Sequence, residues 1–353
     1  MLLSIVMPSH GSDLHTYSRI AHACEFASDR IEVVIRDNSG NPAKGDFLKL
    51  MPRNNCKIIV VDSCDPFENF AKAVEAATGT FLFIVSDDDY FFDRAVPAVF
   101  AAAEAYEDDR TVAGITGTYV LEMSAGSQFV NYGGLDSRDA GDRVSGYLDY
   151  QGRNLIGYAT VRREVAVDAW RLIHAHPIEF SFHDQIFSLL NLLAGRYVHT
   201  NRLLFCYDNA HWEDVNRGAE EDLKFYMRAG IDPAFGRLHW LVLAFEGVSL
   251  IGNSRFGSRL TASERQRTVT RWYQTMLARF AGDQRSNYGS QLGPHADAIG
   301  NKWKSRYPNV QLDEMLNDIC AFMQLFSPEK AERYRTFWTG LAKEALAEAA
   351  TPA

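Results

Sequence analysis

Apolar and polar residues alternate over the first 95 positions in the way expected of strands joined by helices. Short apolar runs at residues 2–7, 31–35, 57–61 and 81–85 predict four buried strands. Apolar residues recur at helical spacing between these runs, near residues 14–28, 47–50 and 67–77. Because strands that alternate with helices form mainly parallel sheets, we expect an α/β fold with a Rossmann-like central sheet. Ligands of such sheets bind beyond the carboxyl ends of the strands.

The pattern changes along the second half of the chain. Strands are predicted at residues 112–120, 129–132 and 196–205, and the polar, glycine-rich stretch from 133 to 142 is either a loop or a mobile lid. From residue 220 onward, apolar residues keep helical spacing in five segments: 220–229, 235–250, 262–280, 313–326 and 328–350. We therefore expect an α-helical C-terminal extension over residues 220–353. Its many aromatic residues suit a helical core or a dimer interface.

The composition is that of an ordinary soluble globular protein. The formal net charge of −9 gives no support to a nucleic-acid-binding surface. The most apolar later segment, 238–251, is too short to span a bilayer, and residues 2–7 lack the basic lead of a secretion signal. The five cysteines are widely spaced and form no CxxC pair, which is typical of reduced thiols. We expect a cytoplasmic protein, and peripheral contact with the inner face of the membrane stays open.

Three consecutive carboxylates, Asp87 to Asp89, follow the strand predicted at 81–85. Adjacent like charges at the end of a buried strand need a compensating cation or solvent. Mn²⁺ or Mg²⁺ binds carboxylate oxygens and fills its shell with substrate phosphates, so the triplet is a candidate metal site. The alternative is a solvated acidic turn that caps the next helix. Asp37 and the loop at residues 8–10 follow two other strands, and this convergence favours a ligand site.

Four short motifs occur in this order along the first 95 residues: LSIVMPSHG, VVIRDNSG, NFAKAVEAATG and FIVSDDD. In this order they resemble the inverting family 2 glycosyltransferases, which have the GT-A fold. That family has a first strand ending at Pro, a second ending at Asp, an Asn-bearing helix before Gly, and a strand ending in a DxD-type motif. The resemblance covers residues 2–95 and, more weakly, 150–215. It implies a GT-A domain over residues 1–219, with a donor half at about 1–110 and an acceptor half at about 111–219.

The resemblance also implies an activity and a donor. Such enzymes transfer a monosaccharide from a nucleoside-diphosphate sugar to an acceptor hydroxyl with inversion, and a UDP-sugar is the favoured donor. Carried over by position, the residues that would bind the donor nucleotide are Pro8, Ser9, His10, Asp37, Asn69 and Asp87. Asp37 would accept a hydrogen bond from the nucleobase, while Asp88 and Asp89 would hold Mn²⁺ or Mg²⁺ and the diphosphate. Ser86 stands where the family has a carboxylate, which leaves open which two Asp residues form the working pair.

On the acceptor side, the residues FHDQ at 182–185 open a predicted helix. The family has a Glu–Asp pair here whose Asp is the general base, so the resemblance makes Asp184 the candidate catalytic base. His183 replaces the Glu and is a second candidate for that role. The alternative is that both residues only cap or solvate the helix. Many members of the family carry an aromatic residue and a His near this point, so the resemblance makes His211 a candidate third metal ligand, with a structural His as the alternative. Trp212 is a candidate for stacking on the acceptor or closing the site.

Three other functions share parts of this pattern. A retaining GT-A enzyme would use the same donor site without a base. A sugar-1-phosphate nucleotidyltransferase has a similar architecture, but its glycine-rich, Arg- or Lys-bearing loop is missing after the first strand. A non-catalytic scaffold would bind partners through the helical extension. We expect a saccharide or glycolipid acceptor, in the synthesis of a bacterial surface polysaccharide or glycolipid, and self-association through the C-terminal helices stays open.

Overall fold

The computed structural model describes residues 1–52, 54–131, 135–149, 157, 159–208, 220, 223–224, 226–227, 230–282 and 293–350. The chain divides into two compact units. The first comprises residues 1–138, 153–174 and 194–213, and the second comprises residues 139–152, 175–193 and 214–353.

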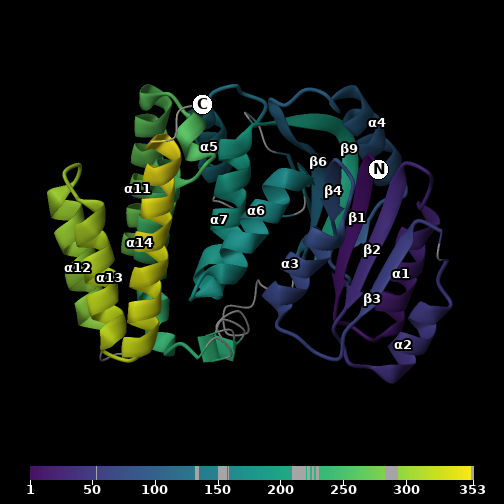
Figure 1. Cartoon of the computed structure of the whole chain (residues 1–353), viewed down its shortest axis with the longest axis horizontal. Coiled ribbons are helices and arrows are strands. Elements are labelled where there is room, and N and C mark those ends of the chain that lie inside the picture. Colours follow the sequence, from purple (N-terminus) through teal and green to yellow (C-terminus); the bar gives the residue numbers. More distant parts are fainter. Residues whose placement is uncertain are drawn as a thin grey trace. The chain divides into compact units, whose positions relative to one another are not determined.

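A nine-stranded mixed sheet forms the core of the first unit (Figure 1). Its strands are β1 (Leu3–Ser9), β2 (Ile31–Asp37), β3 (Cys56–Val60), β4 (Phe81–Ile84), β5 (Tyr90–Phe91), β6 (Val112–Met123), β7 (Gly126–Val130), β8 (Thr160–Arg162) and β9 (Arg196–Asp208). They follow the order β3-β2-β1-β4-β8-β6-β9-β5, and β7 pairs with β6. The two longest ladders, β1 with β2 and β6 with β9, are parallel, while β8 runs antiparallel to β4 and β6. The predicted α/β class and the mostly parallel sheet are confirmed.

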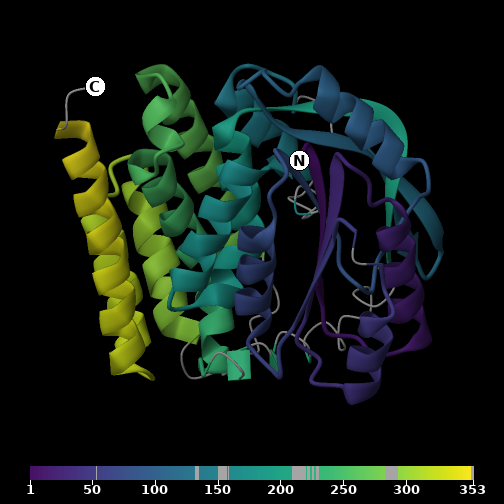
Figure 2. The same cartoon turned by 45° about the vertical axis from the view of Figure 1, so that its right-hand side comes forward.

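Helices cover both faces of the parallel half of this sheet. They are α1 (Leu14–Glu25), α2 (Pro42–Lys49) and α3 (Pro66–Ala76), and the unit also contains α4 (Ala95–Ala105) and α6 (Arg163–Ala175). Figures 1 and 2 show α1 and α2 on one side of β1–β3 and α3 on the other. Phe70 of α3 stacks on Trp170 of α6 with ring centroids 4.8 Å apart. The strand ends therefore emerge between two helical layers.

Capping residues fix where these helices begin. Asp13 accepts a hydrogen bond from the Thr16 amide at 2.7 Å and so caps α1. Asn41 caps α2, and a proline occupies the first turn of that helix, where its missing N–H costs nothing. The helix expected at 47–50 thus begins earlier than predicted, because the Asn–Pro start signal was overlooked.

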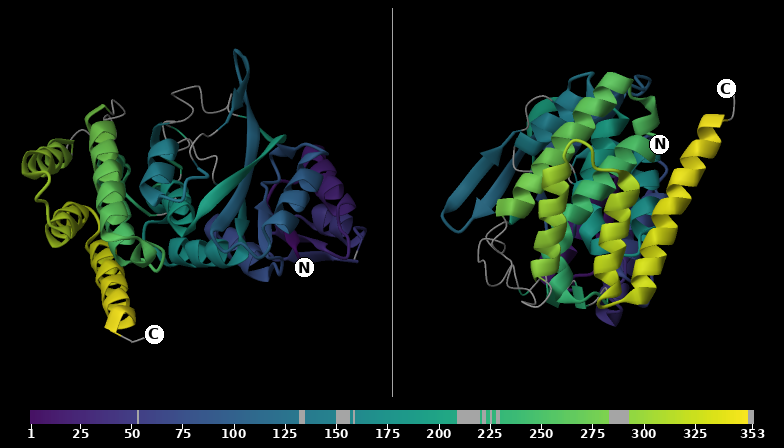
Figure 3. Two further views of the ribbon diagram at one scale, coloured as in Figure 1. Left: turned by 90° about the horizontal axis from the view of Figure 1, so that it is seen from above. Right: turned by 90° about the vertical axis from the view of Figure 1, so that its left-hand side faces the viewer.

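Helices alone build the described part of the second unit. They are α5 (Ala140–Asp149), α7 (Glu179–Ala194), α10 (His239–Asn253), α11 (Ala262–Gly282), α12 (Gly293–Arg306), α13 (Leu312–Gln324) and α14 (Pro328–Ala350), with short 3₁₀ helices at Pro233–Leu238 and Gly257–Arg259. Ten of the 15 residues of α10 are buried, and α11, α13 and α14 pack against it (Figure 3). The predicted helical C-terminal region is confirmed.

Several segments differ from the sequence-based prediction. The stretch expected to be a loop or lid at 133–142 enters α5 at Ala140, and α4, α6 and α12 were not predicted. The segment expected as a helix at 220–229 lies partly outside the described residues. The two units also divide the chain differently from the expected boundary at 219/220. Helix α5 joins the second unit because Asp139 and Asp149 form ion pairs with Arg267 and Arg271 of α11.

Across the described ranges, no helix is long and apolar enough to cross a membrane. All five cysteines lie within these ranges, and each is a free thiol.

Candidate functional site

The parallel register of β1 and β2 places Ser9 directly beside Asp37 at the carboxyl edge of the sheet. Hydrogen bonds continue past both strand ends, from the Asn38 amide to the Ser9 carbonyl at 3.0 Å and from the Val61 amide to the Asp37 carbonyl at 2.9 Å. The Asp37 side chain is only 1% exposed, and its carboxylate accepts hydrogen bonds from the amide and hydroxyl of Ser39. The sheet therefore holds this carboxylate in one place.

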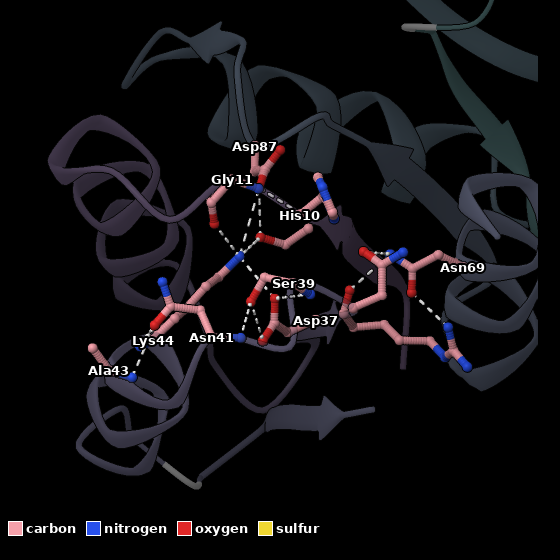
Figure 4. Close-up of polar contacts among 12 residues, drawn as sticks. His10, Gly11, Asp37, Ser39, Asn41, Ala43, Lys44, Asn69 and Asp87 are labelled. Carbon is pink, nitrogen blue, oxygen red and sulfur yellow. Dashed lines mark hydrogen bonds and ion pairs between the residues drawn. The ribbon is translucent and has the colours of Figure 1, made fainter. Parts of the chain in front are cut away.

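Asp87 is the member of the acidic triplet that lies against the loop after β1. One of its oxygens, Oδ2, accepts hydrogen bonds from the Ser9 hydroxyl at 2.6 Å and from the His10 and Gly11 amides at 2.8 Å each. Figure 4 shows these bonds converging on the carboxylate. Gly11 leaves room here, because a Cβ at that position would lie 2.4 Å from the Thr16 hydroxyl oxygen and would displace it. Asp87 thereby shapes the predicted nucleotide loop.

A buried lysine, which sequence reasoning missed, joins these groups. Lys44 of α2 is 0% exposed, and its Nζ lies 2.8 Å from Asp37 Oδ1 and 3.8 Å from Asp87 Oδ2 (Figure 4). A signal for it was present in the sequence. The Asn41–Pro42 start puts Lys44 in the first turn of α2, on the same face as the buried Leu48.

Asn69 of α3 was predicted to bind the donor nucleotide, and its described contacts connect helix to strand. Its amide nitrogen donates to the Arg36 carbonyl at 3.1 Å and to Asn38 Oδ1 at 3.2 Å, and its oxygen accepts from Arg36 Nη1 at 2.5 Å. The residue is 3% exposed. Asn69 thus fixes the end of β2, and direct contact with a nucleotide stays a prediction.

The remaining predicted donor-side residues differ in exposure. Pro8 is buried in β1 opposite Arg36, whereas His10 is exposed beyond the strand. Contact of either residue with a nucleotide stays a prediction.

Asp88 and Asp89 occupy the turn after β4 in different surroundings. Asp88 is exposed and has no hydrogen-bond or ion-pair partner among the described residues, whereas Asp89 is 6% exposed and engaged. Within the described residues, no group of three or more His, Cys, Asp or Glu side chains could hold a metal ion by itself. Proteins often bind Mg²⁺ with one or two carboxylates and leave the rest of its coordination shell to water and substrate phosphates, and a pair of Asp residues fits this arrangement. Hard oxygen donors of this kind also suit Mn²⁺.

On the acceptor side, Asp184 lies in the second turn of α7, which begins at Glu179. The alternative that it caps the helix start is therefore wrong. Its Oδ1 lies 2.6 Å from His183 Nε2, and 48% of its side chain is exposed. Desolvation raises the pKa of Asp184, but the charge and hydrogen bond of His183, together with the charge of His239, outweigh it, so the net direction is downward. At neutral pH this carboxylate is ionised and beside an imidazole.

Two predicted residues, His211 and Trp212, lie outside the described residues. Their proposed parts as third metal ligand and acceptor platform stay predictions.

With this geometry in view, the chain can be compared with known proteins. No protein-family model matches it, and no curated protein matches it in sequence. Among solved structures, it is similar to residues 1–349 of S. aureus TarS, with a TM-score of 0.52 at 13% identity over 98% of this chain and 92% of the other. The chain has a GT-A-like fold.

Other TarS structures give the same match. A complex of TarS 1–349 with UDP-GlcNAc aligns with a TM-score of 0.52 at 15% identity, over 98% of this chain and 92% of that one. The longer TarS structure aligns with a TM-score of 0.50 at 15% identity, and 99% of this chain covers 53% of it. This chain therefore spans about half of that longer protein. At these identities the similarity establishes the fold.

Proposed function

We propose that this chain is a glycosyltransferase that moves a monosaccharide from a nucleoside-diphosphate sugar to an acceptor hydroxyl with inversion. One observation carries the proposal. Ser9, Asp37 and Asp87 come from three different strand ends and meet at the carboxyl edge of a parallel sheet. Ligands of α/β sheets bind at that edge, and the GT-A-like fold is a scaffold on which such a donor site is expected.

The donor nucleotide would lie above β1 and β2. His10 and the backbone of the loop after β1 would line the base and ribose, and Asp37 and Asp87 would supply acceptors for their N–H and O–H groups. TarS structures contain UDP or UDP-GlcNAc, which supports a UDP-sugar as the donor here.

The diphosphate end would lie at the turn after β4. Asp88 and Asp89 would hold Mn²⁺ or Mg²⁺ there, with His211 as a further candidate ligand. When bound, the cation supplies positive charge that stabilises the diphosphate as it leaves. This part is supported by the exposure of Asp88, whose carboxylate has no hydrogen-bond or ion-pair partner in the part of the chain that the structure describes.

Asp184 would accept the proton of the acceptor hydroxyl as that oxygen attacks the anomeric carbon. Its pKa is held below the ordinary value by His183 and His239, so the carboxylate is ionised at neutral pH, the state in which a base can take a proton. His183, at 2.6 Å, would stabilise the ionised carboxylate and orient it.

The acceptor class and setting are inferred by analogy. A saccharide or glycolipid acceptor, handled at the cytoplasmic face of the membrane during surface-polysaccharide or glycolipid synthesis, suits this reading. Trp212 would stack on it, and the helical region would add acceptor contacts or self-association. The donor half over about 1–110 and the acceptor half over about 111–219 belong to the same proposal.

A donor-turnover assay tests the proposed function. The full chain would be incubated with UDP-GlcNAc, UDP-glucose, UDP-galactose and GDP-mannose, each with Mn²⁺ and a panel of saccharide and lipid-linked hydroxyl acceptors. We expect release of nucleoside diphosphate from one donor, and a product with the anomeric configuration inverted by NMR. Retention would overturn inversion and the base role of Asp184. Absence of turnover with every donor would contradict the enzyme assignment.

A further inference from the structure

Lys44 is enclosed by four groups from three segments of the first unit. Its side chain is 0% exposed. Its Nζ donates to the Ser9 hydroxyl at 2.6 Å and to the Gly11 carbonyl at 2.5 Å, and it lies 2.8 Å from Asp37 Oδ1 and 3.8 Å from Asp87 Oδ2. An ammonium group has three hydrogens, so its three short contacts use all of them. Lys44 interacts with Asp87 electrostatically, and the Ser9 hydroxyl connects the two through hydrogen bonds.

We infer that Lys44 is the positioning residue of the nucleotide site: its ammonium holds the loop after β1 and the two carboxylates in the arrangement that receives the nucleoside. This inference rests on the proposed function. Each partner of Lys44 is itself a predicted nucleotide contact or adjoins one. Ser9 and Asp37 are predicted contacts, and Gly11 follows His10 directly.

Charge also makes the ammonium necessary. Asp37 and Asp87 are both buried, and each lies within 4 Å of the same nitrogen, since the two distances are 2.8 and 3.8 Å. Two buried carboxylates without a cation would repel each other. With the lysine present, the sites next to the nucleoside are partly neutralised before any ligand arrives.

The position of Lys44 predicts which part of a nucleotide it affects. Its nitrogen is enclosed by protein groups, so it acts through Ser9, Gly11 and Asp37. Those groups belong to the nucleoside end of the site, whereas Asp88 stands at the expected metal end. Loss of Lys44 should therefore weaken the binding of a nucleoside monophosphate and of a diphosphate by the same factor, with or without Mn²⁺.

Calorimetric titration of the full chain tests this, with the 5′-monophosphates and diphosphates of uridine, guanosine, cytidine and thymidine as probes. For the nucleotide that wild type binds, Lys44→Met should raise the Kd of both forms by about ten-fold or more, equally with and without Mn²⁺. Lys49→Met is the matched control, because Lys49 is on the same helix and its side chain is 73% exposed. Its Kd values should equal those of wild type.

A second pair of variants covers the case in which Lys44→Met does not fold. In Lys44→Met/Asp37→Asn the Asp37 charge, which Lys44→Met alone would leave buried without its cation, is also removed. This double variant should bind the nucleotide more weakly than Asp37→Asn alone, because it also lacks the hydrogen bonds from Lys44 to Ser9 and Gly11. Equal Kd values for that pair, or wild-type Kd values in folded Lys44→Met, would overturn the inference. So would a loss confined to the Mn²⁺-dependent diphosphate. If wild type binds no nucleotide, the proposed function fails as well.

Discussion

Asp87 and Asp88 are adjacent in the chain, yet their surroundings suit them to different tasks. Three donors occupy one oxygen of Asp87 and bind it to the loop after β1. Asp88 is exposed, with no hydrogen-bond or ion-pair partner among the described residues. A carboxylate oxygen already occupied by protein donors is a poor metal ligand, whereas the solvated carboxylate of Asp88 is available. We therefore favour Asp88 as a metal ligand, whereas Asp89, which is buried and engaged, stays a prediction from the resemblance.

Asp88→Asn should weaken metal-dependent binding of the donor diphosphate, because it removes a ligand charge. We expect the Kd for the diphosphate in Mn²⁺ to rise about ten-fold, or ~1.4 kcal/mol, while binding without metal is unchanged. Calorimetry with and without Mn²⁺ measures both. Asp93→Asn is the control, since Asp93 has a 78% exposed side chain in the same segment. Unchanged affinity in Asp88→Asn would remove this residue from the metal site.

Asp184→Asn should abolish transfer of the sugar without weakening donor binding. Loss of a general base typically lowers the rate by about 10²–10⁴-fold. We expect that drop in kcat for transfer, with the Kd for the donor diphosphate kept at its wild-type value. His183→Gln is the companion variant and should have the smaller effect. A reversed order would make His183 the base, and loss of donor binding in Asp184→Asn would make Asp184 a structural residue.

Glu246 should make the stability of the second unit depend on pH. It is buried on α10, with Oε1 3.1 Å from His176 Nε2 and from the Tyr334 hydroxyl. Burial raises the pKa of Glu246 above its ordinary 4.5, although both neighbours lower it. The folded state therefore keeps a proton that the unfolded state releases, and stability falls as pH rises above about 4.5 towards the folded pKa.

Glu246→Gln removes that titration, so its Tm should improve relative to wild type between pH 5 and pH 8. Each kcal/mol corresponds to about 2–4 °C in a unit of this size. Thermal unfolding followed by circular dichroism at the two pH values measures the change. A Tm difference between variant and wild type that stays constant with pH would show that Glu246 has the same pKa in both states.

At the scale of single elements, local signals predicted the strands well and the helix starts less well. Runs such as Phe81–Ile84 are apolar and short, so their strands were found. Lys44 was missed because a lysine in a helix reads as a surface residue, and only the packing of α2 on the sheet buries it. The capping residue Asn41 could have indicated that the helix begins there and includes Lys44. The network around Asn69 joins residues 31 and 33 positions apart, which no local pattern reveals.

Two glycines of α10 give a direct test of helix packing. A Cβ on Gly247 would lie 1.9 Å from Trp272 Nε1, whereas a Cβ on Gly252 would meet nothing within 4 Å. Gly247→Ala should destabilise the chain by about 3 kcal/mol or more, since overpacking displaces a buried ring. Gly252→Ala should stabilise it by up to ~1 kcal/mol through helix propensity. Urea unfolding measures both. Equal effects would mean that α10 and α11 do not pack as described.

At the scale of the whole molecule, the two units are assembled from segments that are distant in sequence. Ion pairs across 128 and 122 positions hold α5 to α11, so a boundary drawn along the chain could not separate the units. The α/β class and the helical C-terminal region followed from periodicity, which is a local property. The strand order β4-β8-β6-β9 depends on pairing between distant segments, so the local pattern of apolar and polar residues could not predict it.

The central claim is that the carboxyl edge of β1, β2 and β4 receives a nucleoside diphosphate with the help of a divalent cation. The most direct test is calorimetric titration of the full chain with UDP, GDP, CDP and dTDP, each with and without Mn²⁺. We predict saturable binding of one diphosphate, with UDP favoured, that tightens when Mn²⁺ is present. Failure of all four to bind in either condition would contradict the account.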